Sequence, residues 1–147
     1  MIKYVKGNLL DVTKGIIVHG CNAQGVMGAG VARVIKLKYP ECFMLYKEYC
    51  DLGYNNLGEI IWYRVKPDLH IVNAITQKQY GRDKRHVNYA AITNVFSEVV
   101  RNAKALNLSI HFPKIGAGLG GGDWNIIEML INDCDPDDTV EKICWEL

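Results

Sequence analysis

The hydrophobic pattern of this chain switches repeatedly between a two-residue and a 3.6-residue period. Segments rich in β-branched and aromatic residues, bounded by Gly, Pro, Asn or Asp, predict strands. These strands are expected at Ile2–Lys6, Gly15–His19, Gly58–Val65, Leu69–Ala74, Ser109–Phe112 and Thr139–Trp145. Helical periodicity predicts helices at Gly30–Lys38, Glu41–Leu52, Tyr89–Leu106 and Trp124–Asp133.

The clearest helical pattern lies in Tyr89–Leu106, where apolar residues recur three and four positions apart. They are Ala91, Ile92, Val95, Phe96, Val99, Val100 and Ala103. Such a stripe is typical of a helix packed on a sheet. Helices that alternate with strands predict an α/β fold, with a mixed central sheet and helices on both faces. The 147 residues fit one domain, 1–147, with one hydrophobic core.

Composition narrows the class of protein. Hydrophobic residues make up 49 % and charged residues 22 %, as in ordinary globular proteins. The net charge of +1 gives no strong nucleic-acid signal. No apolar run approaches a membrane span, and the start of the chain has no signal-peptide pattern, so a cytoplasmic location is expected. The five cysteines form no CxxC pair, which favours reduced thiols over disulfides or structural zinc.

A first glycine-rich segment follows an apolar strand and leads into a helix. Gly25, Gly28 and Gly30 allow positive φ and a close approach of the backbone to a ligand. The free N–H groups and partial positive charge of a helix start suit phosphate. A simple strand-to-helix turn is the alternative interpretation.

A second glycine-rich segment also leaves a strand and enters a helix. Five of the seven residues at 116–122 are glycine, and ordering so much free backbone is entropically unfavourable. The segment fits neither the P-loop nor the Rossmann fingerprint in its usual context. Two such loops at the carboxyl ends of separate strands predict a site that grips a diphosphate from both sides.

Taken together, these segments resemble the macrodomain family. The resemblance is carried by Tyr4–Leu10, His19–Asn22, Met27–Ala32, Lys38–Pro40 and Pro113–Gly121. It implies a three-layer sandwich that binds ADP-ribose without a cofactor. It is closest to the branch that contains ADP-ribose-1''-phosphate phosphatases and terminal ADP-ribose-protein glycohydrolases.

The resemblance implies a set of binding residues. Asn8 stands where macrodomains usually carry an aspartate that holds the adenine amino group, and Asn22 matches the asparagine that faces the distal ribose. The expected ligand-binding residues are Asn8, Leu9, Asn22, Gly25, Val26, Met27, Gly28, Ala29, Gly30, Val31, Ile115, Gly116, Ala117, Gly118, Leu119, Gly120 and Gly121.

The two branches differ at their reacting groups. The glycohydrolases use a lysine and an aspartate, and the matching positions here hold Gln77 and Gly120. Lys78 lies one place later, where a strand would turn it the other way. The phosphatases carry His-x-Cys-Asn, which matches 19–22. We therefore expect a metal-independent hydrolase of ADP-ribose-1''-phosphate. The alternatives are a non-catalytic ADP-ribose-binding module, or a hydrolase that removes ADP-ribose from modified macromolecules.

Three residues are candidates for catalysis. His19, with an ordinary pKa of about 6.5, is either a general base or a satisfied strand-end histidine. Asn22 would orient the distal ribose. Asp123 is either a second acid-base group or the N-cap of the last helix. The polar segment Gln79–His86 is either a flap with Tyr80 as a stacking residue or a solvated loop. His19 and Cys21 lack a third ligand at suitable spacing, so no metal site is expected.

Overall fold

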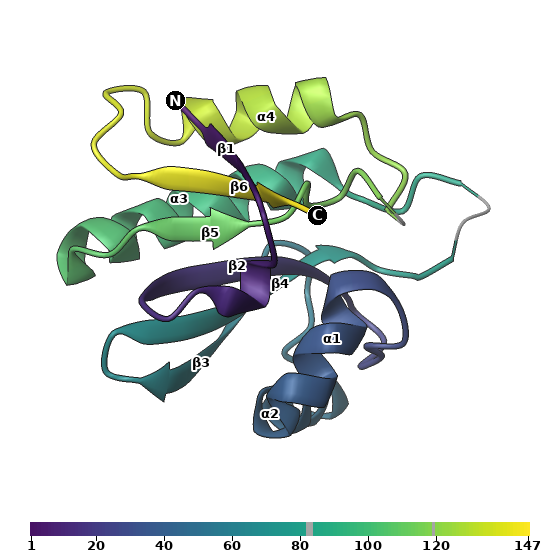
Figure 1. Ribbon diagram of the computed structural model, residues 1–147. Coiled ribbons are helices and arrows are strands. Elements are labelled where there is room, and N and C mark those ends of the chain that lie inside the picture. Colours follow the sequence, from purple (N-terminus) through teal and green to yellow (C-terminus); the bar gives the residue numbers. More distant parts are fainter. Residues whose placement is uncertain (82–83, 119) are drawn as a thin grey trace.

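The structure is a computed structural model that describes residues 1–81, 84–118 and 120–147. Its described strands form one mixed sheet in the order β1-β6-β5-β2-β4-β3 (Figure 1). The strands are β1 (Lys3–Lys6), β2 (Gly15–Asn22), β3 (Ile60–Lys66), β4 (Leu69–Gln77), β5 (Ile110–Phe112) and β6 (Lys142–Glu146). Neighbouring strands pair in parallel except β3, which is antiparallel to β4. The predicted mixed sheet is confirmed.

Helices cover both faces of the sheet, which confirms the expected sandwich. They are α1 (Gly30–Lys38), α2 (Pro40–Asp51), α3 (Tyr89–Leu106) and α4 (Trp124–Asp133). The pair α1 and α2 lies apart from the pair α3 and α4 (Figure 1). Separate hydrophobic clusters on the two faces join each pair to the strands. Within the described ranges, no helix has the length and apolar character needed to cross a membrane.

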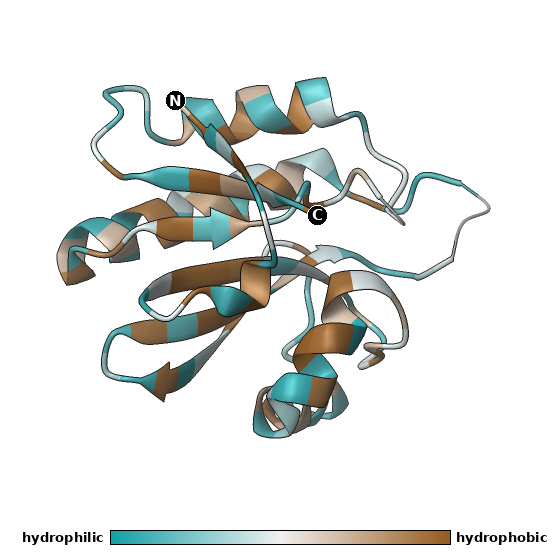
Figure 2. Cartoon of the chain, in the orientation of Figure 1, coloured by the Kyte–Doolittle hydropathy of each residue, from teal (hydrophilic) through white to brown (hydrophobic). Residues whose placement is uncertain are grey.

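The strands β2 and β4 form the centre of the molecule. Helices pack on both faces of these two strands, so nearly all residues of β2 and β4 are buried. Both strands are accordingly apolar along most of their length (Figure 2). All seven apolar residues of the predicted α3 stripe are buried as well. The helical spacing of apolar residues in α3 and the continuous apolar runs of β2 and β4 therefore determine which surfaces of helix and sheet pack together.

Two strands extend well past their predicted ends, while the ends of β3 and β6 lie within one residue of theirs and β6 begins at Lys142 rather than Thr139. β2 continues to Asn22 and β4 to Gln77, and these two residues pair with each other at the carboxyl ends of the strands. Polar side chains interrupt the hydrophobic pattern there, although the backbones of the two strands remain paired. A short 3-10 helix, η1 (Leu9–Asp11), was not predicted. Because β1, β2, β4, β5 and β6 run parallel, their carboxyl ends share one edge of the sheet.

Candidate functional site

A cavity of about 730 Å³ opens at the carboxyl edge of the sheet. It lies between the first glycine loop (residues 23–29, after β2) and the second glycine loop (residues 113–122, after β5). Its lining residues are His19, Gly20, Cys21, Asn22, Val26, Gly28, Ala29, Gly30, Val31, Ala32, Thr76, Gln77, Tyr80, Gly81, Pro113, Lys114, Ile115, Gly116, Ala117, Gly118 and Gly120. The volume is in the usual range for small-molecule sites.

Asn22 organises the first glycine loop. Its Oδ1 accepts from the backbone N–H of Gln24 at 3.0 Å, and its Nδ2 donates to the carbonyl of Val26 at 2.8 Å. The buried Tyr46 hydroxyl of α2 also donates to Asn22, lying 2.6 Å from its backbone carbonyl oxygen and 2.9 Å from Oδ1. The side chain thus fixes the shape of the loop while it borders the cavity.

The start of α1 faces the cavity without a side-chain cap. The N-cap residue is Ala29, which supplies no capping hydrogen bond. Gly30 has a φ of +62°, a conformation that glycine adopts without strain, and it lines the cavity with Val31 and Ala32. The first-turn N–H groups of α1 are therefore placed to receive an anion from the cavity.

The second glycine loop is closely packed at some positions and open at others. Gly116 has a φ of +78°, and a Cβ there would lie 2.7 Å from Val87. A Cβ on Gly122 would lie 2.6 Å from the same side chain. Gly118 borders the cavity, and apart from its chain neighbours no described residue has an atom within 4 Å of a Cβ position there. Packing therefore requires glycine at 116 and 122, whereas the described residues beyond its chain neighbours leave open space for a Cβ at 118.

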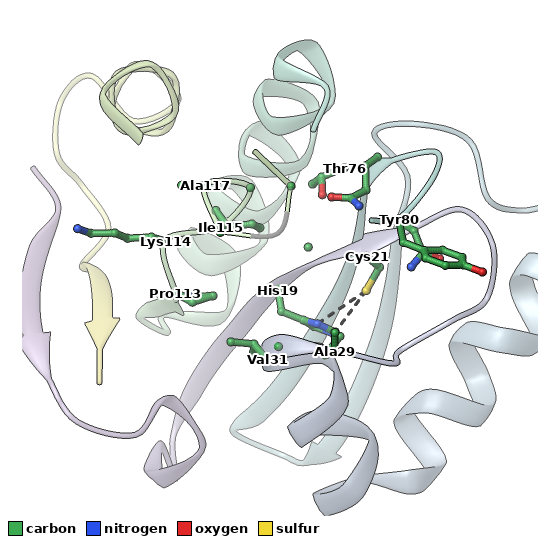
Figure 3. Close-up of a pocket in the computed structure, with 18 of the residues that line it drawn as sticks. His19, Cys21, Ala29, Val31, Thr76, Tyr80, Pro113, Lys114, Ile115 and Ala117 are labelled. Carbon is green, nitrogen blue, oxygen red and sulfur yellow. Dashed lines mark hydrogen bonds between the residues drawn. The ribbon is translucent and has the colours of Figure 1, made fainter. Parts of the chain in front are cut away.

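His19 borders the cavity but is 1 % exposed. Asn73 Nδ2 donates to the Ile61 carbonyl at 3.2 Å, so its Oδ1 faces His19 and accepts from Nε2 at 2.6 Å. The His19 proton is therefore on Nε2, and Nδ1 is the acceptor nitrogen, 3.8 Å from the Cys21 sulfur (Figure 3). Burial lowers the pKa of His19 to about 4, although the bond to Asn73 opposes this shift. The ordinary pKa assumed from the sequence is corrected accordingly.

We expect the protein to lose stability as the pH falls from about 6.5 to 4. The pKa of His19 is lower in the folded than in the unfolded chain, so protonation favours unfolding. Its contribution is complete above pH 6.5 and is lost as the pH falls through the folded pKa. The shift corresponds to about 3 kcal/mol of unfolding free energy. Urea unfolding at pH 7 and pH 4.5 should therefore show a smaller pH dependence for His19→Gln than for wild type.

His111→Gln is the comparison variant: burial also lowers the pKa of this histidine, so its replacement should likewise reduce the pH dependence, and the double variant should reduce it further. Asp135 titrates in a different range: burial raises its pKa, but hydrogen bonds led by that from Lys142 hold it well below its usual range. Its stabilising contribution is lost only as the pH falls below about 4. An undiminished pH dependence in His19→Gln would show that folding does not lower the pKa of His19.

The cavity contains most of the residues expected from the sequence. Six of the expected residues do not line it, namely Asn8, Leu9, Gly25, Met27, Gly121 and Asp123. Leu119 lies outside the described residues. Asp123 caps α4, its Oδ1 accepting from the Asn125 N–H at 2.9 Å. Asn8 caps η1 through the N–H of Leu10. The N-cap interpretation of Asp123 is confirmed, and the structure does not bring its carboxylate to the cavity.

The end of β4 and the segment after it contact Gly120 of the second glycine loop. Gln77 Oε1 would lie 3.0 Å from a Cβ on Gly120, so the two positions that distinguish the branches are adjacent. The Gly120 carbonyl accepts from the N–H groups of His86 and Val87. Tyr80 is 58 % exposed and borders the cavity. Residues 82 and 83 of the expected flap lie outside the described residues.

Several site residues were not found from the sequence. Asn73 and Tyr46 act through His19 and Asn22, which are more than 20 positions away along the chain, so no local pattern reveals them. Thr76 could have been found, because it lies at the polar end of an apolar strand, as Asn22 does. Lys114 also borders the cavity, but its ammonium pairs with Glu146 and points away from the other labelled residues (Figure 3). In the described part of the chain, no group of three His, Cys, Asp or Glu side chains could hold a metal ion.

The fold and the cavity define an α/β sandwich with a ligand site at the carboxyl edge of its sheet. A family model described as Macro domain matches residues 18–131. The chain therefore belongs to the macrodomain family.

Named relatives fall in two groups. A DNA ADP-ribosyl glycohydrolase from Mycobacterium tuberculosis is 32 % identical over 87 % of this chain, which spans only 37 % of that protein. An ADP-ribose 1''-phosphate phosphatase from Candida albicans is 29 % identical over 92 % of this chain and 94 % of its own length. Among solved structures, the macrodomain of Mycobacterium tuberculosis DarG has a TM-score of 0.85 at 30 % identity, covering 100 % of this chain and 98 % of that one.

Proposed function

We propose that the cavity binds ADP-ribose, with its diphosphate between the two glycine loops. The observation that carries this proposal is the pairing of an uncapped α1 start with an open Gly118 on opposite sides of one cavity. Backbone N–H groups satisfy phosphate oxygens without a cation. This agrees with Lys114, whose charge is paired with Glu146.

The order of the strands supports an extended ligand. Asn8, the expected adenine contact, follows β1, and Gln77 ends β4, four strand spacings away along one edge. At about 4.8 Å per spacing this is about 19 Å. A dinucleotide-sized ligand would cover much of this edge, with adenine toward β1 and the distal ribose toward β4.

We further propose that the protein hydrolyses ADP-ribose-1''-phosphate. His19, neutral at pH 7, would accept a proton through Nδ1 from a water that attacks phosphorus. The bond between phosphorus and the oxygen on C1'' then breaks, and that oxygen takes up a proton. The products are ADP-ribose and inorganic phosphate. Support comes from the phosphatase relatives that match this chain over nearly their whole length.

A second candidate function is the removal of ADP-ribose from DNA. The identity to DNA ADP-ribosyl glycohydrolases favours it, as do the exposed cationic residues Lys78, Lys84 and Arg85 after β4. Against it stand the uncharged Gln77 and Gly120, which lie next to each other at the positions where the resemblance places the lysine and aspartate of the glycohydrolase branch. Phosphate release is therefore our first choice.

Isothermal titration calorimetry tests the binding proposal. We expect ADP-ribose to bind with micromolar affinity and AMP at least about tenfold more weakly, because AMP has neither the diphosphate nor the second ribose. ADP, which has the diphosphate but no second ribose, should bind with intermediate affinity. Equal affinities for AMP and ADP-ribose would contradict a diphosphate held between the two loops.

A further inference from the structure

Thr76 is a buried residue whose hydroxyl has no hydrogen-bond partner within the described part of the chain. It is the penultimate residue of β4, and its side chain is fully buried. Buried polar atoms in folded proteins nearly always have a partner, and one without a partner destabilises the fold. The hydroxyl is therefore unfavourable for stability as long as the cavity holds no ligand.

The neighbouring strand leaves room for this side chain. A Cβ on Gly20 of β2 would lie 2.8 Å from Thr76 Oγ1 and 3.2 Å from Ile115 Cγ1. Gly20 does not have a positive φ, so its backbone conformation does not demand glycine. Glycine is needed at position 20 because any larger residue would place its Cβ against the Thr76 hydroxyl. All three residues line the cavity, so the buried hydroxyl lies directly behind the cavity wall, next to Gly20.

The hydroxyl belongs to the distal end of the proposed site. Thr76 lies on β4, on the far side of β2 from β5, β6 and β1. In Figure 3, Thr76 and Tyr80 lie on one side of the cavity, and Pro113 and Lys114 lie on the other. A ligand with its adenine toward β1 therefore presents its second ribose to Thr76.

We propose that Thr76 is a specificity-determining residue that hydrogen-bonds an oxygen on the distal ribose. The proposal rests on the proposed binding of ADP-ribose in this cavity. A hydroxyl can donate to a ribose oxygen and accept from a ribose hydroxyl, whereas a nucleotide without the second ribose offers neither group here. Thr76 thus selects ligands that carry the distal sugar, at a cost in the stability of the free protein.

The test compares Thr76→Val, which keeps the shape and removes the hydroxyl, with Thr76→Ser, which keeps the hydroxyl. Calorimetry with ADP-ribose and ADP is combined with thermal unfolding of the ligand-free variants. We expect Thr76→Val to weaken ADP-ribose binding about 5- to 10-fold, the effect of one lost hydrogen bond, and to leave ADP binding unchanged. Its melting temperature should equal or exceed that of wild type. Thr76→Ser should retain ADP-ribose affinity.

Thr139→Val is the matched control, because the Thr139 hydroxyl donates to Asp135 at 2.7 Å. This variant should melt at a lower temperature and bind ADP-ribose as wild type does. If Thr76→Val binds ADP-ribose normally, or weakens ADP equally, the proposal is overturned while the ADP-ribose site stands. If Thr76→Val melts well below wild type, the hydroxyl has a structural role instead. A wild-type protein that binds neither ligand overturns the proposed function, and this inference with it.

Discussion

Gly118→Glu is expected to abolish ADP-ribose binding, with an affinity loss of more than about 100-fold, in a protein that remains folded. The fold should tolerate the substitution, because among the described residues none but its chain neighbours comes within 4 Å of a Cβ at 118, and the φ there is not positive. Binding should fail because the side chain would enter the cavity and place a carboxylate near the diphosphate. Calorimetry, with circular dichroism to confirm folding, measures both effects.

Two variants at the same position separate size from charge. Gly118→Ala should bind ADP-ribose within a few-fold of wild type, since a methyl group has open space. Gly118→Gln should weaken binding less than Gly118→Glu, since it is of equal size and uncharged. A folded Gly118→Glu protein with normal affinity would show that the second glycine loop does not border the diphosphate.

His19→Gln is expected to lower the rate of phosphate release from ADP-ribose-1''-phosphate by about 100-fold, the usual contribution of a positioned general base. The glutamine amide can still donate to Asn73, so the hydrogen bond made by Nε2 has a substitute while the acceptor Nδ1 is lost. ADP-ribose affinity should change little, because the glycine loops supply most of the contacts. Phosphate release under saturating substrate measures the effect.

The pH dependence of the same reaction follows from the burial of His19. With a pKa of about 4, the imidazole stays unprotonated across the neutral range. The wild-type rate should therefore be flat from pH 8 to about pH 5 and fall below that. His111→Gln is the control, since this histidine is bonded to Trp145 and does not line the cavity. If the His19→Gln protein is fully active, the water is activated by another group or by the substrate.

The fold was predictable because long, regular patterns specify it. Tyr89–Leu106 buries its whole apolar stripe, and the central strands are apolar for most of their length. The ends of β2 and β4 were not predicted, because Asn22, Thr76 and Gln77 interrupt the hydrophobic pattern although the backbone still pairs there. The extent of a strand depends on its ladder partners, which a single local sequence does not contain.

The sequence predicted which loops border the site, but it did not predict the pKa values and hydrogen bonds of the residues in it. Glycine spacing was enough to indicate the segments that border the cavity. It could not reveal that His19 is enclosed by Asn73 and Cys21, because these contacts arise only when the strands and helices assemble. The pKa of His19 and the unpartnered hydroxyl of Thr76 are likewise consequences of packing.

Release of inorganic phosphate from ADP-ribose-1''-phosphate by the wild-type protein, measured with and without a metal chelator, tests the account most directly. We predict steady release of one phosphate per ADP-ribose formed, at the same rate with chelator, and no release by the Gly118→Glu variant. Absence of phosphate release from a wild-type protein that binds ADP-ribose would contradict the phosphatase and leave a binding module. Release by Gly118→Glu at the wild-type rate would contradict the placement of the substrate between the two glycine loops.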